Sequence, residues 1–564
     1  MKTTLRKLVA LTLALILVFC LCSCDISGYD DSNNKIYTYD EAVTELDAKL
    51  GKVTKINVDA PLDIYDLDNP TKALADISTF DLTVRGNGTI DIEIAAPSEL
   101  SGSAPDDLIN VLAKNFNNQR HQVNGKTASV SIRSISSGEV VTYMTEGDYR
   151  PDLYIPSSFA LGEMLSAKGI DVIKLSDRLF GNTAGILMEK QVHADFTAKY
   201  GDVTVDKVLE ASLAGDLVFG YTNPYTSATG LNILATMLHS FDPNNPLSDT
   251  ASQKLLDYQK QAPPVAYTTG VLRTQAARGI IKAMVMEEQA FVNTPELKDY
   301  VYTPAGIRHD HPAYTFGYVS AEKQEVARLF VEYCLSSEAQ RLANDKGFNR
   351  HDDYTGQSSG LDGAGYLAAQ KVWKANKDGG KPIIAVFVAD VSGSMGNNGA
   401  LDALKQSLLA TSSYIGSDHY VGLISYSDKV YVNLEIKQFD EMQRAYFSGA
   451  VKAMSAGGGT ATYDATLVAL KMLDEKAKEV PDAKLMLFVL SDGDSQSGYS
   501  LNSIKNIVSG MRVPVYTIGY NLENTGASAS KQLSDLSALN EAALISTDTD
   551  GIINQLRNLF NVQL

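Results

Sequence analysis

Residues 383–395 read IIAVFVADVSGSM, so that a seven-residue apolar run, Ile383 to Ala389, passes directly into a polar loop. An uninterrupted apolar run of this length is typical of a strand buried on both faces, as in a parallel sheet that is covered by helices. Three more apolar runs follow, with helical patterns between them: Tyr420 to Ser425, Leu485 to Leu490 and Val513 to Ile518. This alternation predicts a doubly wound, Rossmann-like α/β domain over residues 381–564.

Oxygen-bearing side chains stand in three loops of this predicted sheet. Asp390, Ser392 and Ser394 alternate directly after the first strand, Thr460 ends a glycine-rich loop, and Asp492 follows the run that ends at Leu490. Ligands of doubly wound sheets bind at the loops beyond the carboxyl ends of the strands. Carboxylate and hydroxyl oxygens suit Mg²⁺, Mn²⁺ or Ca²⁺ and do not suit zinc. The same residue types also serve as turn and helix-cap residues without any metal.

The order Asp-x-Ser-x-Ser, then Thr, then Asp resembles the metal-ion-dependent adhesion site of von Willebrand factor type A domains, over roughly residues 381–564. The resemblance implies that Asp390, Ser392, Ser394, Thr460 and Asp492 hold one divalent cation, Mg²⁺ or else Mn²⁺ or Ca²⁺. It also implies that an acidic group of a protein or glycan partner takes an open coordination position. A last amphipathic helix is expected around residues 552–560, where this family shifts its C-terminal helix between states.

Residues 89–347 alternate strand-like and helical runs, which predicts a second α/β module with a largely parallel sheet. Hydroxyl residues follow several of the strand-like runs, namely Ser98, Ser136, Ser157, Thr226 and Ser227. Hydroxyls and free backbone N–H groups at helix starts can form a cradle for a small anion or polar solute. The same side chains are equally suited to capping their helices.

Four segments of this module resemble the two-lobed bacterial extracellular solute-binding proteins, a group that includes oxyanion receptors. They are Ala95 to Glu99, Ser136 to Gly138, Pro151 to Ser158 and Asn223 to Gly230. The resemblance implies a periplasmic-binding-protein-like fold with two lobes around a polar cleft, and Asp310-His311-Pro312 as the return into the first lobe. Because no zinc-site spacing accompanies them, His309 and His311 are expected at the surface.

The amino terminus has the pattern of a targeting segment. Lys2, Arg6 and Lys7 precede an uncharged run of 15 residues, Leu8 to Cys22, which is short for a membrane span and suits a signal peptide. The sequence Leu21-Cys22-Ser23-Cys24 resembles a bacterial lipobox, which implies cleavage after residue 23 and a lipid on Cys24. A plain secretory peptide and an uncleaved anchor are the alternatives. The lipoprotein interpretation places the chain on the extracellular face of a bacterial cell membrane.

The remaining segments are assigned by composition and pattern. Residues 1–23 are the expected signal peptide, 24–34 a polar tether, 35–88 a small leader with a helix over Tyr39 to Leu50, and 348–380 a linker. Trp373, the single tryptophan, is expected to pack a domain junction.

Composition narrows the class of function. The chain has 564 residues with 49 Lys and Arg against 67 Asp and Glu, a net charge of −18, so a nucleic-acid partner is not expected. Since no motif combines a nucleophile with a base, a hydrolase is a remote alternative and we expect a non-enzymatic protein. The sequence favours a surface lipoprotein that grips a protein or glycan through its cation site, with a solute-binding-like module of unknown ligand. The alternative is the solute receptor of an ABC-type transporter for a small anion or polar solute.

Overall fold

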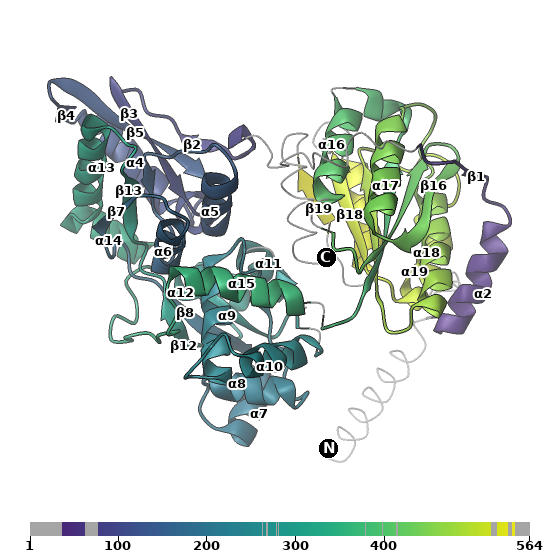
Figure 1. The fold of residues 1–564 in the computed structure, drawn as a ribbon, viewed down its shortest axis with the longest axis horizontal. Coiled ribbons are helices and arrows are strands. Elements are labelled where there is room, and N and C mark those ends of the chain that lie inside the picture. The colour runs from purple at the N-terminus through teal and green to yellow at the C-terminus, as the bar shows by residue number, and fades with distance from the viewer. Residues whose placement is uncertain are drawn as a thin grey trace, which may run out of the picture.

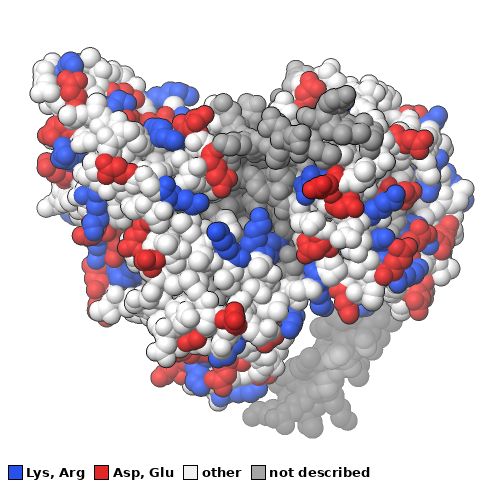
Figure 2. Space-filling view, in the orientation of Figure 1, with Lys and Arg blue, Asp and Glu red and all other residues white. Residues whose placement is uncertain are grey.

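The computed structural model describes residues 37–61, 77–520, 527–539 and 544–547, apart from 262, 267–268, 278, 280, 378, 398 and 413–414. The expected signal peptide, the tether, Cys24 and the expected helix at 552–560 lie outside the described residues. Figure 1 shows two α/β bodies, and Figure 2 shows acidic and basic side chains interspersed on both. Within the described part of the chain, no helix has the length and apolar character needed to cross a membrane.

The carboxyl-terminal body is built on a seven-stranded sheet with β14 (Ile383–Asp390) at its centre. β14 pairs in parallel with β15 (Tyr420–Tyr426) on one side and with β17 (Lys484–Ser491) on the other. β18 (Val515–Tyr520) and β19 (Leu544–Thr547) continue the parallel part, whereas β16 (Val430–Gln438) is antiparallel to β15. All residues of β14 are buried, as the continuous apolar run predicts.

Helices cover both faces of this sheet. One face packs against α16 (Ala400–Ser412) and α17 (Glu441–Ala453), and the other against α18 (Thr462–Glu479) and α19 (Leu501–Met511). Successive residues of β14 point to opposite faces, so that Phe387 joins the first apolar cluster and Val388 the second. The helix α21 (Ala527–Ala538) packs near β18. The expectation of a doubly wound sheet is therefore confirmed.

The expected leader is divided between the two bodies rather than forming a unit of its own. The helix α2 (Tyr39–Leu50) occupies the predicted range, and Thr38 and Glu41 form a capping box at its start. Its side chains Ala42 and Leu46 are buried in the apolar cluster that α18 and α19 line. β1 (Lys55–Asn57) then extends the sheet by pairing in parallel with β16 (Figure 1).

The close packing of α2 on α19 depends on a glycine. A Cβ atom at position 510 would lie 2.7 Å from the Cβ of Ala42 and 3.0 Å from that of Tyr37. The later part of the leader contains a short 3₁₀ helix (Ile77–Thr79) and β2 (Leu82–Val84), which joins the first lobe of the other body. The chain therefore leaves the carboxyl-terminal body after β1 and returns to it at β14.

The first lobe of the solute-binding-like body contains the sheet β2-β5-β3-β6-β13-β7. Its strands are β3 (Ile90–Ala96), β5 (Lys126–Ser134), β6 (Leu153–Tyr154), β7 (Val172–Ser176) and β13 (Ala313–Phe316), and β4 (Gln122–Val123) pairs with β5. Its helices are α3 (Ser98–Ser101), α4 (Leu108–Gln119), α5 (Ser137–Glu146), α6 (Phe159–Ala167), α13 (Ala321–Cys334) and α14 (Ser337–Asp345). β3 is parallel to β5 and β6, as expected, while β13 is antiparallel to its neighbours because it returns from the second lobe.

The second lobe is built on an antiparallel sheet. β8 (Thr183–Glu189) lies between β11 (Ala283–Glu287) and β12 (Tyr300–Arg308), and β9 (Tyr221–Thr222) pairs with β10 (Val265–Ala266). Its helices are α7 (Lys190–Tyr200), α8 (Val205–Leu213), α9 (Ala228–Phe241), α10 (Asp249–Gln259), α11 (Thr269–Ala277) and α12 (Glu288–Val292), with a 3₁₀ turn at Pro295–Leu297. The antiparallel sheet departs from the largely parallel arrangement that the strand and helix alternation predicts.

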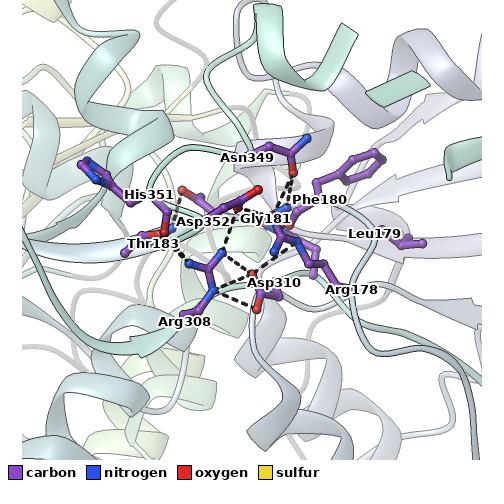
Figure 3. Close-up of polar contacts among 12 residues, drawn as sticks. Arg178, Leu179, Phe180, Gly181, Thr183, Arg308, Asp310, Asn349, His351 and Asp352 are labelled. Atoms are coloured by element: carbon purple, nitrogen blue, oxygen red, sulfur yellow. Dashed lines mark hydrogen bonds and ion pairs between the residues drawn. The ribbon is translucent and has the colours of Figure 1, made fainter. Parts of the chain in front are cut away.

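The segments that join the lobes are tied together by charged side chains. These crossing segments are residues 177–182, 309–312 and 346–362. Arg178 donates to Asp352 at 2.5 Å, and Arg308 donates to Asp310 at 2.9 Å and lies 3.7 Å from Asp352 (Figure 3). The Asn349 side chain accepts from the Gly181 N–H at 2.7 Å. The network links all three crossing segments and so fixes the chain where one lobe passes into the other.

The expected linker, residues 348–380, contains a helix, which corrects that assignment. α15 (Gly363–Asn376) packs on α6 of the first lobe and on α9 and α10 of the second. Trp373 lies in the core of the second lobe and its indole N–H donates to Tyr221 Oη at 2.7 Å, so it does not pack the expected domain junction. Tyr366, Ala369 and Trp373 share a helical spacing that the surrounding glycines obscure.

The docking of α2 gives a first prediction. Replacing Leu46, which is fully buried, by Ala should destabilise the carboxyl-terminal body by about 2–5 kcal/mol, since it leaves a cavity against α18 and α19. Hydrogen exchange should accelerate in α18 and α19 but not in the two lobes. Glu45→Ala, at an exposed position of the same helix, serves as the control. Equal exchange in the two variants would contradict a structural role for the leader.

Candidate functional sites

The first candidate site lies at the carboxyl edge of the seven-stranded sheet. In the register of β14 and β17, Ala389 is the partner of Leu490, so the loops that follow Asp390 and Ser491 leave the sheet side by side. The glycine loop before α18 docks on the first of these loops. The Gly393 N–H donates to the Gly458 carbonyl at 3.0 Å, and the Gly457 N–H donates to the Val391 carbonyl at 2.8 Å.

A chain of hydrogen bonds connects four of the five expected ligands. The Ser392 N–H donates to Asp390 Oδ1 at 2.7 Å, and the two hydroxyl oxygens of Ser392 and Ser394 are 3.0 Å apart. The Ser394 hydroxyl in turn donates to Asp492 Oδ1 at 2.8 Å. Thr460 is buried in the docked glycine loop, where its carbonyl accepts from the Gln496 N–H at 2.8 Å. Sequence reasoning thus selected residues that the fold gathers on three adjoining loops.

Burial shapes the electrostatics of the two acids. Asp390 is fully buried, and its second carboxylate oxygen accepts from the Ser491 hydroxyl at 2.6 Å and from Tyr426 Oη at 3.4 Å. Burial raises the pKa of Asp390 to about 6, even though these hydrogen bonds favour the carboxylate. Burial also raises the pKa of Asp492, which the hydrogen bond from Ser394 opposes.

The donor set fits a hard divalent cation. Every candidate ligand offers oxygen, and the two buried acids would gain from a positive charge that offsets their desolvation. Ser392 is buried whereas Ser394 is exposed, so the site is closed toward the sheet and open toward solvent. Such an arrangement leaves room for a ligand from outside the chain.

The second candidate site is a cavity of about 510 Å³ between the two lobes. All five residues expected at a polar cleft line it: Ser98, Ser136, Ser157, Thr226 and Ser227. α5 from the first lobe meets the loop before α9 here, because the Gly138 N–H donates to the Thr226 carbonyl at 3.1 Å. A side chain at position 138 would collide with the Tyr225 carbonyl, so this close approach requires glycine.

Several of these hydroxyls already donate to acceptors within the protein. Ser136 donates to Glu139 at 2.7 Å, Ser157 donates to Glu99, and Thr226 donates to the Asn223 carbonyl at 3.4 Å. Ser227 accepts from Thr222 at 2.9 Å. These hydroxyls therefore order the walls of the cavity. Two acidic side chains of the lining accept hydrogen bonds from hydroxyls, Glu99 from Ser157 and Glu287 from Thr229.

These acidic side chains, Glu99 and Glu287, are functional candidates that sequence reasoning missed. Glu99 lies on α3 of the first lobe, and Glu287 ends β11 of the second. Glu287 accepts from Thr229 and, at 3.4 Å, from Thr269. A carboxylate directly after an apolar strand, as in the run from Ala283 to Glu287, is the signal that could have found Glu287.

The crossing segment 309–312 places a histidine beside each of these acids. His311 Nε2 lies 3.7 Å from Glu99 Oε1, and His309 Nδ1 lies 3.6 Å from Glu287 Oε1. Both histidines are fully buried, so the expectation that they lie at the surface is wrong. The crossing segment is enclosed by both lobes, and the sequence pattern around it does not reveal this.

The two acids differ in their electrostatic environment. Burial opposes ionisation of Glu99, but His311 and the hydrogen bond from Ser157 outweigh it and hold the pKa below its ordinary value. Burial and the charge of Glu99 raise the pKa of Glu287. Burial lowers the pKa of His309 to about 4, so its ring is neutral at physiological pH.

Comparisons with known proteins divide the chain in the same way. The family model for bacterial extracellular solute-binding proteins matches residues 100–349, and the model for the von Willebrand factor type A domain matches residues 385–560. No curated protein sequence matches significantly.

Solved structures similar to parts of this chain include members of both groups. A von Willebrand factor type A protein from Catenulispora acidiphila is 17% identical, with 32% of this chain and 42% of that chain covered and a TM-score of 0.29. The sulfate-binding protein SubI from Mycobacterium tuberculosis H37Rv is 13% identical, with 51% and 91% covered and a TM-score of 0.35. A periplasmic thiamin binding protein is 13% identical, with 53% and 99% covered and a TM-score of 0.38.

This chain thus spans less than half of the length of the Catenulispora acidiphila protein. The solute-binding domain implies an extracellular or periplasmic location. The two family matches and the two α/β bodies lead to one conclusion: the chain combines a bacterial extracellular solute-binding domain with a carboxyl-terminal von Willebrand factor type A domain.

Proposed function

We propose that this protein is a non-enzymatic surface lipoprotein that binds an acidic group of a protein or glycan partner through a divalent cation. Asp390, Ser392, Ser394, Thr460 and Asp492 would hold the ion, which is Mg²⁺ or else Mn²⁺ or Ca²⁺. The observation that carries the proposal is the hydrogen-bonded chain from Asp390 to Asp492 across two adjoining loops, with Ser394 exposed at its open side.

The chemistry of this edge explains why an acidic partner suits it. Hydroxyl ligands are neutral, so an ion held by two serines, a threonine and acids that act in part through water keeps positive charge. That charge is available on the solvent side, where Ser394 is exposed. The Ser491 hydroxyl donates to Asp390 at 2.6 Å. This bond joins the ends of β14 and β17 and fixes the start of the loop that carries Ser392 and Ser394.

The proposed anchor completes this function. A lipid on Cys24 would hold the chain on the extracellular face of a bacterial membrane through the tether of residues 24–34. The described chain then enters the carboxyl-terminal body directly, through α2 and β1. The adhesion domain would therefore be the part of the protein nearest the anchor in sequence.

A second candidate function is the solute receptor of an ABC-type transporter. The cavity of about 510 Å³ between the lobes favours it, because this volume lies in the range of small-molecule sites. The domain organisation argues against transport as the main function, since the solute-binding body is inserted between β1 and β14 of the von Willebrand factor type A domain. In the surface-protein proposal, the cavity takes a small solute without delivering it to a permease.

Divalent-ion binding gives the second prediction. Calorimetry on the full chain should detect one site for Mg²⁺, Mn²⁺ or Ca²⁺, and a concentration of 100 times the dissociation constant should stabilise the domain by about 2.7 kcal/mol. Asp390→Ala should abolish this binding while the domain remains folded, because the substitution removes a buried acid whose ionisation burial already opposes.

Asp418→Ala is the matched control, since Asp418 is exposed and precedes β15 at the opposite edge of the sheet. It should leave ion binding unchanged. Undiminished binding in Asp390→Ala, or no binding at millimolar ion concentrations in the unmodified chain, would refute the adhesion-site assignment.

Lipid attachment gives the third prediction. Bacteria that express the unmodified chain should incorporate labelled fatty acid into it, and Cys24→Ala should abolish the label, because the lipidated thiol is lost. Cys22→Ala should retain the label and serves as the control. Label on the Cys24→Ala protein would show that another residue carries the lipid or that the segment is processed differently.

A further inference from the structure

The interlobe cavity is lined by more negative than positive side chains. Its described lining contains four carboxylates, Glu99, Asp106, Glu287 and Glu296, and a single guanidinium, that of Arg273. The positive charge of Arg273 is paired with Asp106 of the other lobe, because Arg273 Nη2 donates to Asp106 Oδ2 at 2.8 Å. Gln289 donates to the other oxygen of Asp106 at 2.8 Å. The remaining interior acids, Glu99 and Glu287, face the cavity from opposite lobes.

Neither of these two acids has an ion-pair partner among the described lysines and arginines. The Asn232 Nδ2 group, which can only donate, lies 2.9 Å from His309 Nε2, so that ring carries its proton on Nδ1 and is neutral. His309 Nδ1 and His311 Nε2 face Glu287 and Glu99, and both atoms are buried without a hydrogen-bond partner. The two acids line the cavity, and each has a buried histidine beside it.

Three of the groups that could favour an anion already have partners within the protein. Helix amino termini carry about half a positive charge, but the Gly138 N–H at the start of α5 is bonded to the Thr226 carbonyl. The hydroxyls of Ser157 and Thr229 donate to Glu99 and Glu287. These bonds support the carboxylates and leave fewer donors for an anionic solute.

We propose that the cavity binds an organic cation of the amine or guanidinium class, held between Glu99 of the first lobe and Glu287 of the second. A donor group of this class bonds to carboxylates through charge-assisted hydrogen bonds, and one placed between the two acids removes the repulsion between them. The cavity of about 510 Å³ accommodates a small organic molecule. The inference rests on the solute-binding part of the proposed function and names the charge of the solute.

Calorimetry on the full chain tests the inference, with EDTA present so that the cation site of the adhesion domain does not contribute. The cationic probes are putrescine, agmatine and arginine, and the comparison probes are sulfate, glutamate and glucose, each at millimolar concentrations. At least one cationic probe should bind. Glu99→Gln and Glu287→Gln should each weaken its binding by about tenfold or more, since each replaces a charge-assisted hydrogen bond by a neutral one.

Glu210→Gln is the matched control, because Glu210 lies on the outer helix α8 and contacts Lys207 there. It should leave the affinity unchanged. Glu99 is 22% exposed and Glu287 is 5% exposed, so Glu99→Gln alone keeps the test valid should Glu287→Gln fail to fold.

Binding of sulfate or glucose without any response to the cationic probes would overturn the inference and leave the module a solute binder. Cation binding that Glu99→Gln does not weaken would also overturn it, because the site would lie elsewhere. If no probe of either kind binds, the inference fails together with the solute-binding part of the proposed function.

Discussion

The parallel pairing of β14 with β15 and β17 is the constraint on which the adhesion domain depends. It buries β14 on both faces and brings the ends of neighbouring strands to one edge of the sheet. Asp390 is the last residue of β14 and Asp492 directly follows β17, so the register alone brings these acids onto adjoining loops. The hydroxyls of Ser392 and Ser394 then connect them. A shift of one residue in this pairing would turn each side chain to the other face.

A second constraint comes from the course of the chain. β1 precedes the solute-binding body in the sequence and pairs with β16, and β14 follows that body after residue 380. The whole solute-binding body is therefore inserted between two strands of one sheet. α15 packs on both lobes and runs to within a few residues of β14. The two bodies are therefore joined by two chain segments, and the helix before β14 contacts both lobes.

The sequence predicted those features that one segment decides by itself. The run Ile383 to Ala389 is continuous because burial on both faces leaves no place for a polar residue. Of the five proposed ligands, Asp390, Ser392 and Ser394 follow a spacing that one loop imposes. The pairing of β1 with β16 was not predictable, because three exposed residues carry no pattern that assigns them to a sheet. α15 was hidden by the glycines at its start, although Tyr366 and Trp373 mark its buried side.

The acids of the cavity depend on distant parts of the chain and were not predictable in this way. Glu99 and Glu287 come from opposite lobes, and only the return of the crossing segment 309–312 places a buried histidine beside each. The five hydroxyl residues line the cavity, as the sequence indicated. The hydroxyls of Ser136 and Ser157, however, donate to glutamates of the protein and are not available to an anionic solute. Local spacing thus identifies candidates, whereas long-range packing decides their charge environment.

We propose that the edge of the β14 sheet holds one divalent cation. Crystals of the full chain grown with Mn²⁺ and measured at the manganese absorption edge test it most directly, because anomalous scattering locates the ion without reference to the protein coordinates. We expect a single strong peak in this domain, within bonding distance of the hydroxyl oxygens of Ser392 and Ser394. The absence of such a peak, or a peak only at other residues, would contradict it.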